Sequence, residues 1–265
     1  MSRIAGRLAE LKKASKKALI PYFVSGDPSL SATVDMMHAL VDSGADILEL
    51  GVGFSDPMAE GPTIQLAHER ALANKVSLRD TLAIVAKFRQ TDSTTPVVLM
   101  GYANPIEVMG YQRFAEQAKA AGVDGVLVVD LPPEEADQFQ SILSQFEIDN
   151  IFLIAPTTEF ARVQKIVKAA TGYIYYVSLK GVTGAGHLDV DSVKSKLTEI
   201  RTVTDLPLCV GFGIKDADSA RQIAALADGA VVGSAIVDRI AQADSASDAI
   251  ASVKAFTQTI REAIN

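Results

Sequence analysis

Glu49 is the residue whose type and position most strongly suggest chemistry, because it is an acidic side chain in the apolar run ADILELG at 45–51. If this run is a strand, its side chains alternate, so that Ile47, Glu49 and Gly51 share one face. Apolar surroundings disfavour the charged carboxylate and raise its pKa. A carboxyl group that titrates near neutral pH can give and take protons, so Glu49 is the leading candidate for an acid–base catalyst. The alternative is a structural carboxylate paired with a buried Lys or Arg, but no apolar run supplies such a partner.

The segment after Glu49 is a loop that carries two further carboxylates. It reads GVGFSDPMAEGPTIQ over 51–65 and contains Asp56 and Glu60. Its glycines and prolines predict a shaped segment. Closure of such a loop could bring a second carboxylate into a site. A solvated acidic turn would explain the same residues equally well on loop chemistry alone.

Two short glycine motifs near the C-terminus suggest a phosphate site. VGFGI (210–214) and VVGSAIV (231–237) each end a β-type run, where small residues let a phosphate reach backbone N–H groups. The segment GSAIVDRI, which starts at Gly233, predicts a short helix whose N-terminus faces the ligand, and helix N-termini attract anions. Ordinary tight turns would explain either motif alone, whereas both motifs together predict phosphate binding.

Other reactive residue types give weaker signals. SLKGVTGAGH (178–187) holds three glycines and predicts a flexible flap. Lys180 in this flap suggests a Schiff-base aldolase, but such a lysine should be desolvated and fixed, which a glycine-rich loop does not favour. The histidines His38, His68 and His187 lack metal-ligand spacing, so no metal site is predicted. We expect His38 and His68 at the surface or at an interface.

Short β-type runs alternate with helical patterns along the whole chain. Eight runs, most of them rich in Val, Ile and Leu, are expected to be parallel strands buried on both faces. They cover 18–24, 45–51, 95–101, 124–130, 150–156, 172–178, 206–212 and 229–234. Helices are expected at 29–44, 77–90, 133–146 and 216–228, and at the N-terminus, where Ile4, Leu8 and Leu11 lie at helical spacing. Ser77 and Asp80 form a candidate capping box, and the single cysteine, Cys209, is expected to be a buried strand residue.

This alternation predicts an α/β protein with one domain over 1–265, a single (β/α)8 TIM barrel with an N-terminal helix and a short phosphate-binding helix after the eighth strand. A doubly wound open sheet is the alternative, but it usually has a glycine-rich phosphate turn after its first strand, where this chain has SGDPS. Catalytic residues of a TIM barrel lie where its strands end. That rule favours Glu49, the loop after it and the two glycine motifs.

Composition limits the classes of partner. The apolar fraction of 48% is enough for a large core, and the net charge of −7 argues against nucleic acid. No run approaches the roughly 18 continuous apolar residues of a membrane span, so no membrane association is expected. The N-terminus lacks the apolar block of a signal peptide, and the expected location is therefore cytoplasmic.

Several motifs together resemble the tryptophan synthase α subunit family. They are LELGVGFSDPMAEGPTIQ (48–65), PYFVSGDPS (21–29), SLKGVTGAG (178–186) and the VGFGI and VVGSAIV pair. They follow the family's order over nearly the whole chain, and the first is highly specific. The resemblance implies a lyase of L-tryptophan biosynthesis that cleaves indole-3-glycerol phosphate to indole and glyceraldehyde 3-phosphate in a retro-aldol reaction, without a cofactor of its own.

The resemblance also implies roles for single residues. Glu49 would protonate the indole ring carbon at the bond to be broken and take the proton from the glycerol hydroxyl. Glu60, where the family usually has aspartate, would engage the indole N–H and stabilise the positive charge on the ring. Phosphate is expected on backbone N–H groups of Gly184, Gly213, Gly233 and Ser234. The pocket is expected to be lined by Tyr22, Met100, Tyr102, Leu127, Ile154, Tyr175, Thr183 and Phe212, with Tyr175 and Thr183 hydrogen-bonding in the closed site.

A partner follows from the same resemblance: a pyridoxal-phosphate β subunit that receives indole through a tunnel in an α2β2 heterotetramer. Asp56, Pro57 and Pro132 are expected at its docking surface. Glu60 lengthens the usual aspartate by one methylene, which affects the rate, because a misplacement of ~1 Å can cost ~100-fold. Gly53 replaces the usual proline and predicts a more mobile loop that depends more strongly on the partner.

Two other functions stay open. One is a non-catalytic subunit that binds a phosphate ligand and activates a β partner, to which Glu60 gives some weight. The other is a Schiff-base phosphosugar aldolase acting through Lys180.

Overall fold

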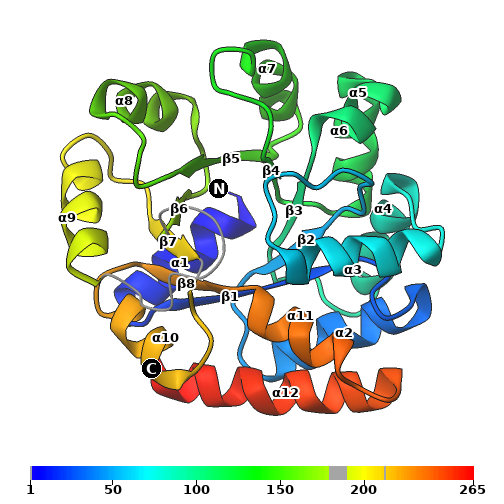
Figure 1. Cartoon of the computed structure of the whole chain (residues 1–265). Coiled ribbons are helices and arrows are strands. Elements are labelled where there is room, and N and C mark those ends of the chain that lie inside the picture. The colour runs from blue at the N-terminus through cyan, green and yellow to red at the C-terminus, as the bar shows by residue number, and fades with distance from the viewer. Residues whose placement is uncertain (1, 179–189, 212) are drawn as a thin grey trace.

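Eight parallel strands close into a barrel in the computed structural model, which describes residues 2–178, 190–211 and 213–265. Each strand pairs with the next in sequence, and β8 pairs with β1 to close the ring. The strands are β1 (Ala18–Val24), β2 (Leu48–Gly51), β3 (Val97–Gly101), β4 (Gly125–Val128), β5 (Asp149–Ile154), β6 (Ile174–Val177), β7 (Leu208–Gly211) and β8 (Gly229–Val232). Figure 1 looks into the barrel and shows most helices in a ring around it. The predicted TIM barrel is confirmed.

The strands form where the sequence is most continuously apolar. Every residue of β1, β2, β3, β4, β7 and β8 is buried, as expected for parallel strands covered on both faces. Seven of the eight predicted runs contain a strand completely, and the fifth run, 150–156, starts one residue after β5 begins at Asp149. Cys209 is buried in β7 as predicted. Most strands are shorter than their runs because the run ends enter turns. The eighth run, for example, ends as a strand at Val232, and Ser234 already starts a helix.

Twelve helices accompany the strands in the described part of the chain. They are α1 (Arg3–Lys13), α2 (Leu30–Asp42), α3 (Pro62–Ala73), α4 (Leu78–Phe88), α5 (Ala103–Met109), α6 (Tyr111–Ala121), α7 (Asp137–Gln145), α8 (Phe160–Ala169), α9 (Val190–Arg201), α10 (Ala217–Ala224), α11 (Ser234–Ala241) and α12 (Ala246–Ala263). The capping box of Ser77 and Asp80 at the start of α4 is confirmed. No helix within the described ranges is long and apolar enough to cross a bilayer.

The predicted start of the helix at 133–146 is wrong. Helix α7 begins at Asp137, and the residues before it form short turns. In these turns the N–H of Glu135 donates to the carbonyl of Pro132 at 3.0 Å, and the N–H of Ala136 donates to that of Pro133 at 3.4 Å. These contacts span three residues, so the proline-rich segment after β4 is a turn that precedes the helix.

Helix α1 covers the end of the barrel where the strands begin, and in Figure 1 it lies across the barrel opening. Ile4, Leu8 and Leu11 are buried on one side of it, as predicted. Arg3 and Arg7 of the same helix pair with carboxylates that stand just before strands. The N-terminal helix therefore closes the barrel at the end opposite the candidate site.

Those carboxylates fasten neighbouring strands together. Asp124, just before β4, accepts a hydrogen bond from the N–H of Val97 at 2.9 Å and pairs with Arg89 at 2.7 Å. Asp46, just before β2, accepts one from the N–H of Leu19 at 2.8 Å. Both carboxylates are buried, and loss of one member of a buried ion pair is strongly destabilising. The barrel is thus fixed at the ends where strands begin, which leaves the opposite ends for chemistry.

Candidate active site

Glu49 lies in β2, in register with Tyr22 of β1 and Val98 of β3. Its side chain is fully buried. The hydroxyl of Tyr173, the residue just before β6, donates a short hydrogen bond to carboxyl oxygen Oε1 of Glu49. The second oxygen, Oε2, is buried and has no hydrogen-bond partner in the described structure. One side of the carboxyl group is therefore held in place, and the other is left for a further hydrogen bond.

Burial sets the protonation of Glu49. The pKa of its carboxyl group is raised to about 7. Removal from water is the main cause and nearby Glu60 adds to it, whereas the hydrogen bond from Tyr173 lowers the pKa. The direction is the one that the apolar strand pattern predicts. Glu49 is therefore poised to exchange a proton at neutral pH.

Tyr173 is a site residue that the sequence reasoning missed. It lies in the run GYIYYVS, where Tyr173 and Tyr175 share one face if side chains alternate. Both are buried, and a buried tyrosine hydroxyl usually finds a hydrogen-bond partner. A search for the partners of strand tyrosines could have proposed Glu49.

Glu60 lies in the loop between β2 and α3 and is half-buried. Burial raises the pKa of its carboxyl group to about 7. Its N–H donates to the carbonyl of Pro57 at 3.0 Å, and its own carbonyl accepts from Nε2 of Gln65 at 2.9 Å. These bonds fix the backbone and leave the carboxyl group directed at the cavity that Glu60 lines.

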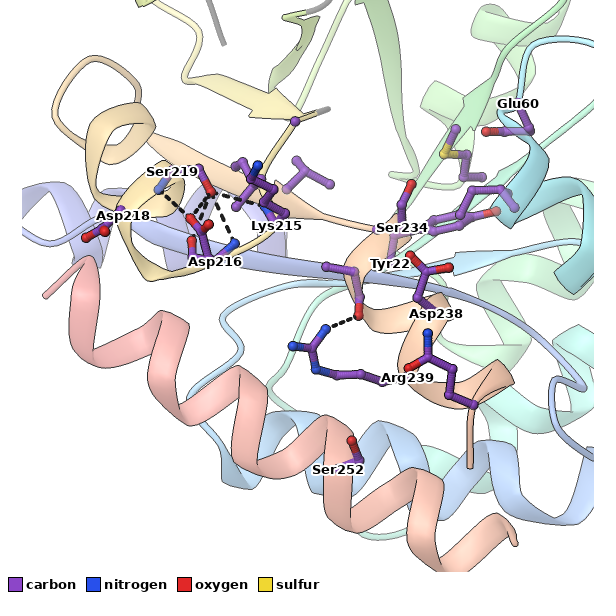
Figure 2. Close-up of a pocket in the computed structure, with 18 of the residues that line it drawn as sticks. Tyr22, Glu60, Lys215, Asp216, Asp218, Ser219, Ser234, Asp238, Arg239 and Ser252 are labelled. Carbon is purple, nitrogen blue, oxygen red and sulfur yellow. Dashed lines mark hydrogen bonds between the residues drawn. The ribbon is translucent and has the colours of Figure 1, made fainter. Parts of the chain in front are cut away.

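The cavity has a volume of about 840 Å³ and lies where strands end. Tyr22, Met100, Tyr175 and Glu60 line it. The first three are predicted substrate-pocket residues and Glu60 is the predicted second carboxylate, and their roles toward a substrate stay predictions. Figure 2 shows Glu60, Tyr22 and Ser234 reaching this pocket from different elements. A cavity of this size is within the range that holds small-molecule ligands.

Two tyrosines connect the cavity to the buried carboxylate. Glu49 does not line the cavity, but Tyr22 and Tyr175 do. Burial raises the hydroxyl pKa of Tyr22 well above its usual value, and the charges of Glu60 and Glu49 raise it further. Tyr175 is affected in the same way, by burial and then by Glu49 and Glu60. Both carboxylates therefore act on the same two hydroxyl groups, and the structure brings Glu49 and Glu60 to one site.

The same cavity is lined by Gly213, Gly233 and Ser234. Helix α11 starts at Ser234, and no side chain caps its N-terminus. Gly213 has a φ of 80°, a left-handed conformation that favours glycine. The uncapped N–H groups and the helix dipole suit an anion at this point. The fourth predicted phosphate residue, Gly184, lies outside the described residues.

The remaining predicted pocket residues are placed differently. Tyr102, Leu127 and Ile154 are buried and are not among the residues that line the cavity. Their contact with a ligand stays a prediction. The remaining predictions, on Thr183, Phe212, Lys180 and His187, lie outside the described residues.

The surface near this end of the barrel carries exposed apolar side chains. Asp56 is exposed, and Pro57 and Pro132 are half-buried. Met58 in the same loop is 77% exposed, and Val108 in α5 is 83% exposed. Both apolar residues were missed by the sequence reasoning, although single exposed apolar residues are common. Met58 belongs to the loop of Glu60, and Val108 to the helix that follows β3, so both are candidates for a contact with a partner.

The prediction that His68 lies at the surface or at an interface is wrong, since the residue is only 1% exposed. Ile64, Ala67 and Ala71 are the other buried residues of α3, and His68 falls on the same stripe. Helical periodicity could have placed it there. His38, by contrast, is half-buried in α2. Among the described residues no group of three or more His, Cys, Asp or Glu side chains could hold a metal ion.

Comparisons with known proteins agree with one another. A family model described as tryptophan synthase alpha chain matches residues 8–265. A tryptophan synthase alpha chain from Thioalkalivibrio sulfidiphilus is 60% identical over 242 residues, 91% of each chain, and one from Nitrosococcus oceani is 56% identical over 266 residues, 100% of this chain and 98% of its own. The crystal structure of tryptophan synthase subunit alpha from Legionella pneumophila is similar with a TM-score of 0.92 at 46% identity, over 100% of this chain and 98% of that one. A structure of tryptophan synthase from M. tuberculosis in an aminoacrylate-bound form is similar at 0.89 and 34% identity, over 100% of both chains.

Proposed function

This chain belongs to the tryptophan synthase alpha chain family, the α subunits of a lyase of tryptophan biosynthesis, and on that premise we propose that it cleaves indole-3-glycerol phosphate to indole and glyceraldehyde 3-phosphate. The observation that carries the proposal is the pair formed by Glu49 and Glu60, both with a pKa raised to about 7. The pair stands beside a cavity that also reaches the uncapped N-terminus of α11.

The phosphate would anchor the substrate. Backbone N–H groups at Gly213, Gly233 and Ser234 line the cavity and can donate to phosphate oxygens without an added charge. Binding there would leave the indole ring and the glycerol hydroxyl near the two carboxyl groups. Positioning of this kind lowers the activation free energy, because the reacting groups are already held in the geometry of the reaction.

The chemical step would use both carboxyl groups. Protonated Glu49 donates its proton to carbon 3 of the indole, and the ionised Glu60 accepts a hydrogen bond from the ring N–H and stabilises the positive charge. The bond between carbon 3 and the glycerol carbon then breaks, and its electron pair returns to the ring. The carboxylate of Glu49 takes the proton of the glycerol hydroxyl, whose oxygen becomes the aldehyde carbonyl. Glu49 ends protonated, ready for the next cycle.

The protonation states that this step needs fit a pair that titrates together. Glu49 must begin protonated and Glu60 ionised. Since burial raises the pKa of each to about 7, the pair holds about one proton between them at neutral pH. Tyr173, which donates to Oε1 of Glu49, would keep the carboxyl group oriented during the two proton transfers.

The proposed partner is a tryptophan synthase β chain in an α2β2 heterotetramer, with pyridoxal phosphate on the β chain and no cofactor on this one. Asp56, Pro57 and Pro132 are proposed to contact it. The exposed side chain of Met58, next to Pro57, supports an apolar contact at this surface. The cytoplasm stays the predicted location.

Indole formation tests the proposal directly. The purified chain is incubated with indole-3-glycerol phosphate, alone and with a tryptophan synthase β chain, and both products are quantified by chromatography. We expect both products in equal amounts and a higher rate with the β chain. Ligand binding without cleavage in either condition would instead favour the non-catalytic subunit, and a borohydride-trapped adduct would favour the aldolase.

A further inference from the structure

Three contacts hold the loop that carries Glu60. The backbone N–H of Phe54 donates to Nδ1 of His68 in α3 at 3.2 Å. The ring of Phe54 stacks on the ring of Tyr102, with centroids 4.8 Å apart and planes at 21°. The hydroxyl of Tyr102 accepts a hydrogen bond from the N–H of Ala59 at 3.1 Å, one residue before Glu60. The contacts form a continuous path from α3 to the residue before Glu60.

His68 is the fixed end of this path. Its side chain is 1% exposed, and burial lowers its pKa to about 4, so the imidazole is neutral at physiological pH. Because Nδ1 accepts from Phe54, the ring proton must be on Nε2. Nε2 is buried and has no hydrogen-bond partner in the described structure. An unsatisfied buried donor destabilises a fold, and an apolar side chain on this stripe of α3 would avoid that cost.

The protein therefore keeps a polar residue where packing favours an apolar one. Within the described part of the chain, the hydrogen bond from Phe54 is the one polar contact made by a ring nitrogen of His68. Gly53, next to Phe54, leaves the backbone free to move, since a glycine is restrained by no side chain. The hydrogen bond from the N–H of Phe54 to His68 therefore restrains the loop backbone directly after this flexible glycine.

We propose that His68 is a positioning residue for Glu60, acting through Phe54, Tyr102 and Ala59. The proposal rests on the proposed role of Glu60 in cleavage. Loss of the acceptor would free the N–H of Phe54 and loosen the stacked ring. A shift of ~1 Å in the carboxylate could then reduce the rate up to ~100-fold, while phosphate contacts at α11 stay intact.

Two substitutions at His68 separate positioning from packing. His68→Leu removes the acceptor and keeps an apolar volume. His68→Asn places a side-chain oxygen close to the position of Nδ1, where it can accept from Phe54. His38→Leu is the matched control, because His38 contacts Phe88 on the outer helices and not the loop.

Amide hydrogen exchange of residues 52–61 and steady-state kinetics provide the readouts. For His68→Leu we expect exchange at Phe54 and Ala59 to be about 10-fold faster or more, and kcat to fall about 10- to 100-fold with KM changed less than about 3-fold. His68→Asn should restore slow exchange and most of kcat, and His38→Leu should resemble the unsubstituted protein.

Unchanged loop exchange and kcat in His68→Leu would overturn the inference. A loss of kcat that asparagine does not rescue would also overturn it, since that result means packing. If His68→Leu does not fold, His68→Gln replaces it, because its oxygen lies one methylene too far and should give the same loss. If the unsubstituted chain releases no indole, the proposed function fails, but the exchange measurement still decides whether His68 holds the loop.

Discussion

Replacement of Glu49 by glutamine should stabilise the fold at alkaline pH while it removes activity. Burial raises the pKa of this carboxyl group from its usual 4.5 to about 7. The folded protein therefore binds the proton more tightly than the unfolded chain, so stability declines as pH rises through this range and levels off above about 7. At about 1.4 kcal/mol per pH unit, the span from 4.5 to about 7 corresponds to roughly 3 kcal/mol.

Glutamine isolates this effect because it resembles the protonated carboxyl group in shape but cannot ionise. Its side-chain oxygen can still accept the hydrogen bond from Tyr173. Urea unfolding should therefore give equal stability for Glu49→Gln and the unsubstituted protein near pH 5. Near pH 8.5 the variant should be more stable by roughly 3 kcal/mol. Its kcat should be at least ~100-fold lower, since the proton donor is gone.

An exposed carboxylate provides the control. Glu262→Gln, near the end of α12, changes the same functional group at the surface and should alter stability by less than about 0.5 kcal/mol at either pH. The reasoning is refuted if Glu49→Gln shows the same stability difference near pH 5 and near pH 8.5, because the gain would then come from packing and not from ionisation.

Four further outcomes follow from the site and the barrel. The pH profile of kcat/KM should be bell-shaped around pH 7, falling on the acid side as Glu60 gains a proton and on the alkaline side as Glu49 loses one; a flat profile from pH 5 to 9 would contradict this. Tyr173→Phe removes a bond that lowers the pKa of Glu49, so the alkaline limb should move to higher pH and kcat should fall about 10-fold; an unmoved limb would count against this role. Gly53→Pro should slow amide exchange of the loop and reduce the activation by a β chain, since a side chain has room at this position; unchanged exchange would disprove the link to mobility. Asp124→Asn should destabilise the fold by about 3–5 kcal/mol in urea unfolding, because it leaves the largely buried guanidinium of Arg89 without its opposite charge; a loss below about 1 kcal/mol would contradict the role of this pair.

The barrel and its leading carboxylate were predictable because both depend on local patterns. Continuous apolar runs such as 18–24 identify strands buried on both faces, and an acidic residue inside such a run is conspicuous at Glu49. The glycine motif at Gly233 identified the start of α11 for the same reason. The alternation of strands and helices then limits the possible folds to a few α/β architectures, of which the closed barrel is one.

Contacts between distant segments were not predictable from these patterns. Tyr173 reaches Glu49 across 124 residues, and only closure of the barrel brings β2 and the start of β6 to the same interior. Helical periodicity could have placed His68 among the buried residues of α3, but it could not have shown the hydrogen bond that His68 accepts from Phe54. Helix α7 starts later than predicted because Pro132 and Pro133 begin turns. A proline followed by acidic residues is typical of a helix N-terminus, but here these residues form the turns that precede the helix.

The most direct test of the central claim is cleavage of indole-3-glycerol phosphate in deuterated water, with mass and position of the label read in the indole by mass spectrometry and NMR. If Glu49 protonates the ring carbon, the unsubstituted protein should release indole with one deuterium at carbon 3, and Glu49→Gln should release at least ~100-fold less product. Turnover by Glu49→Gln at the rate of the unsubstituted protein would contradict the account, whatever label the product carries.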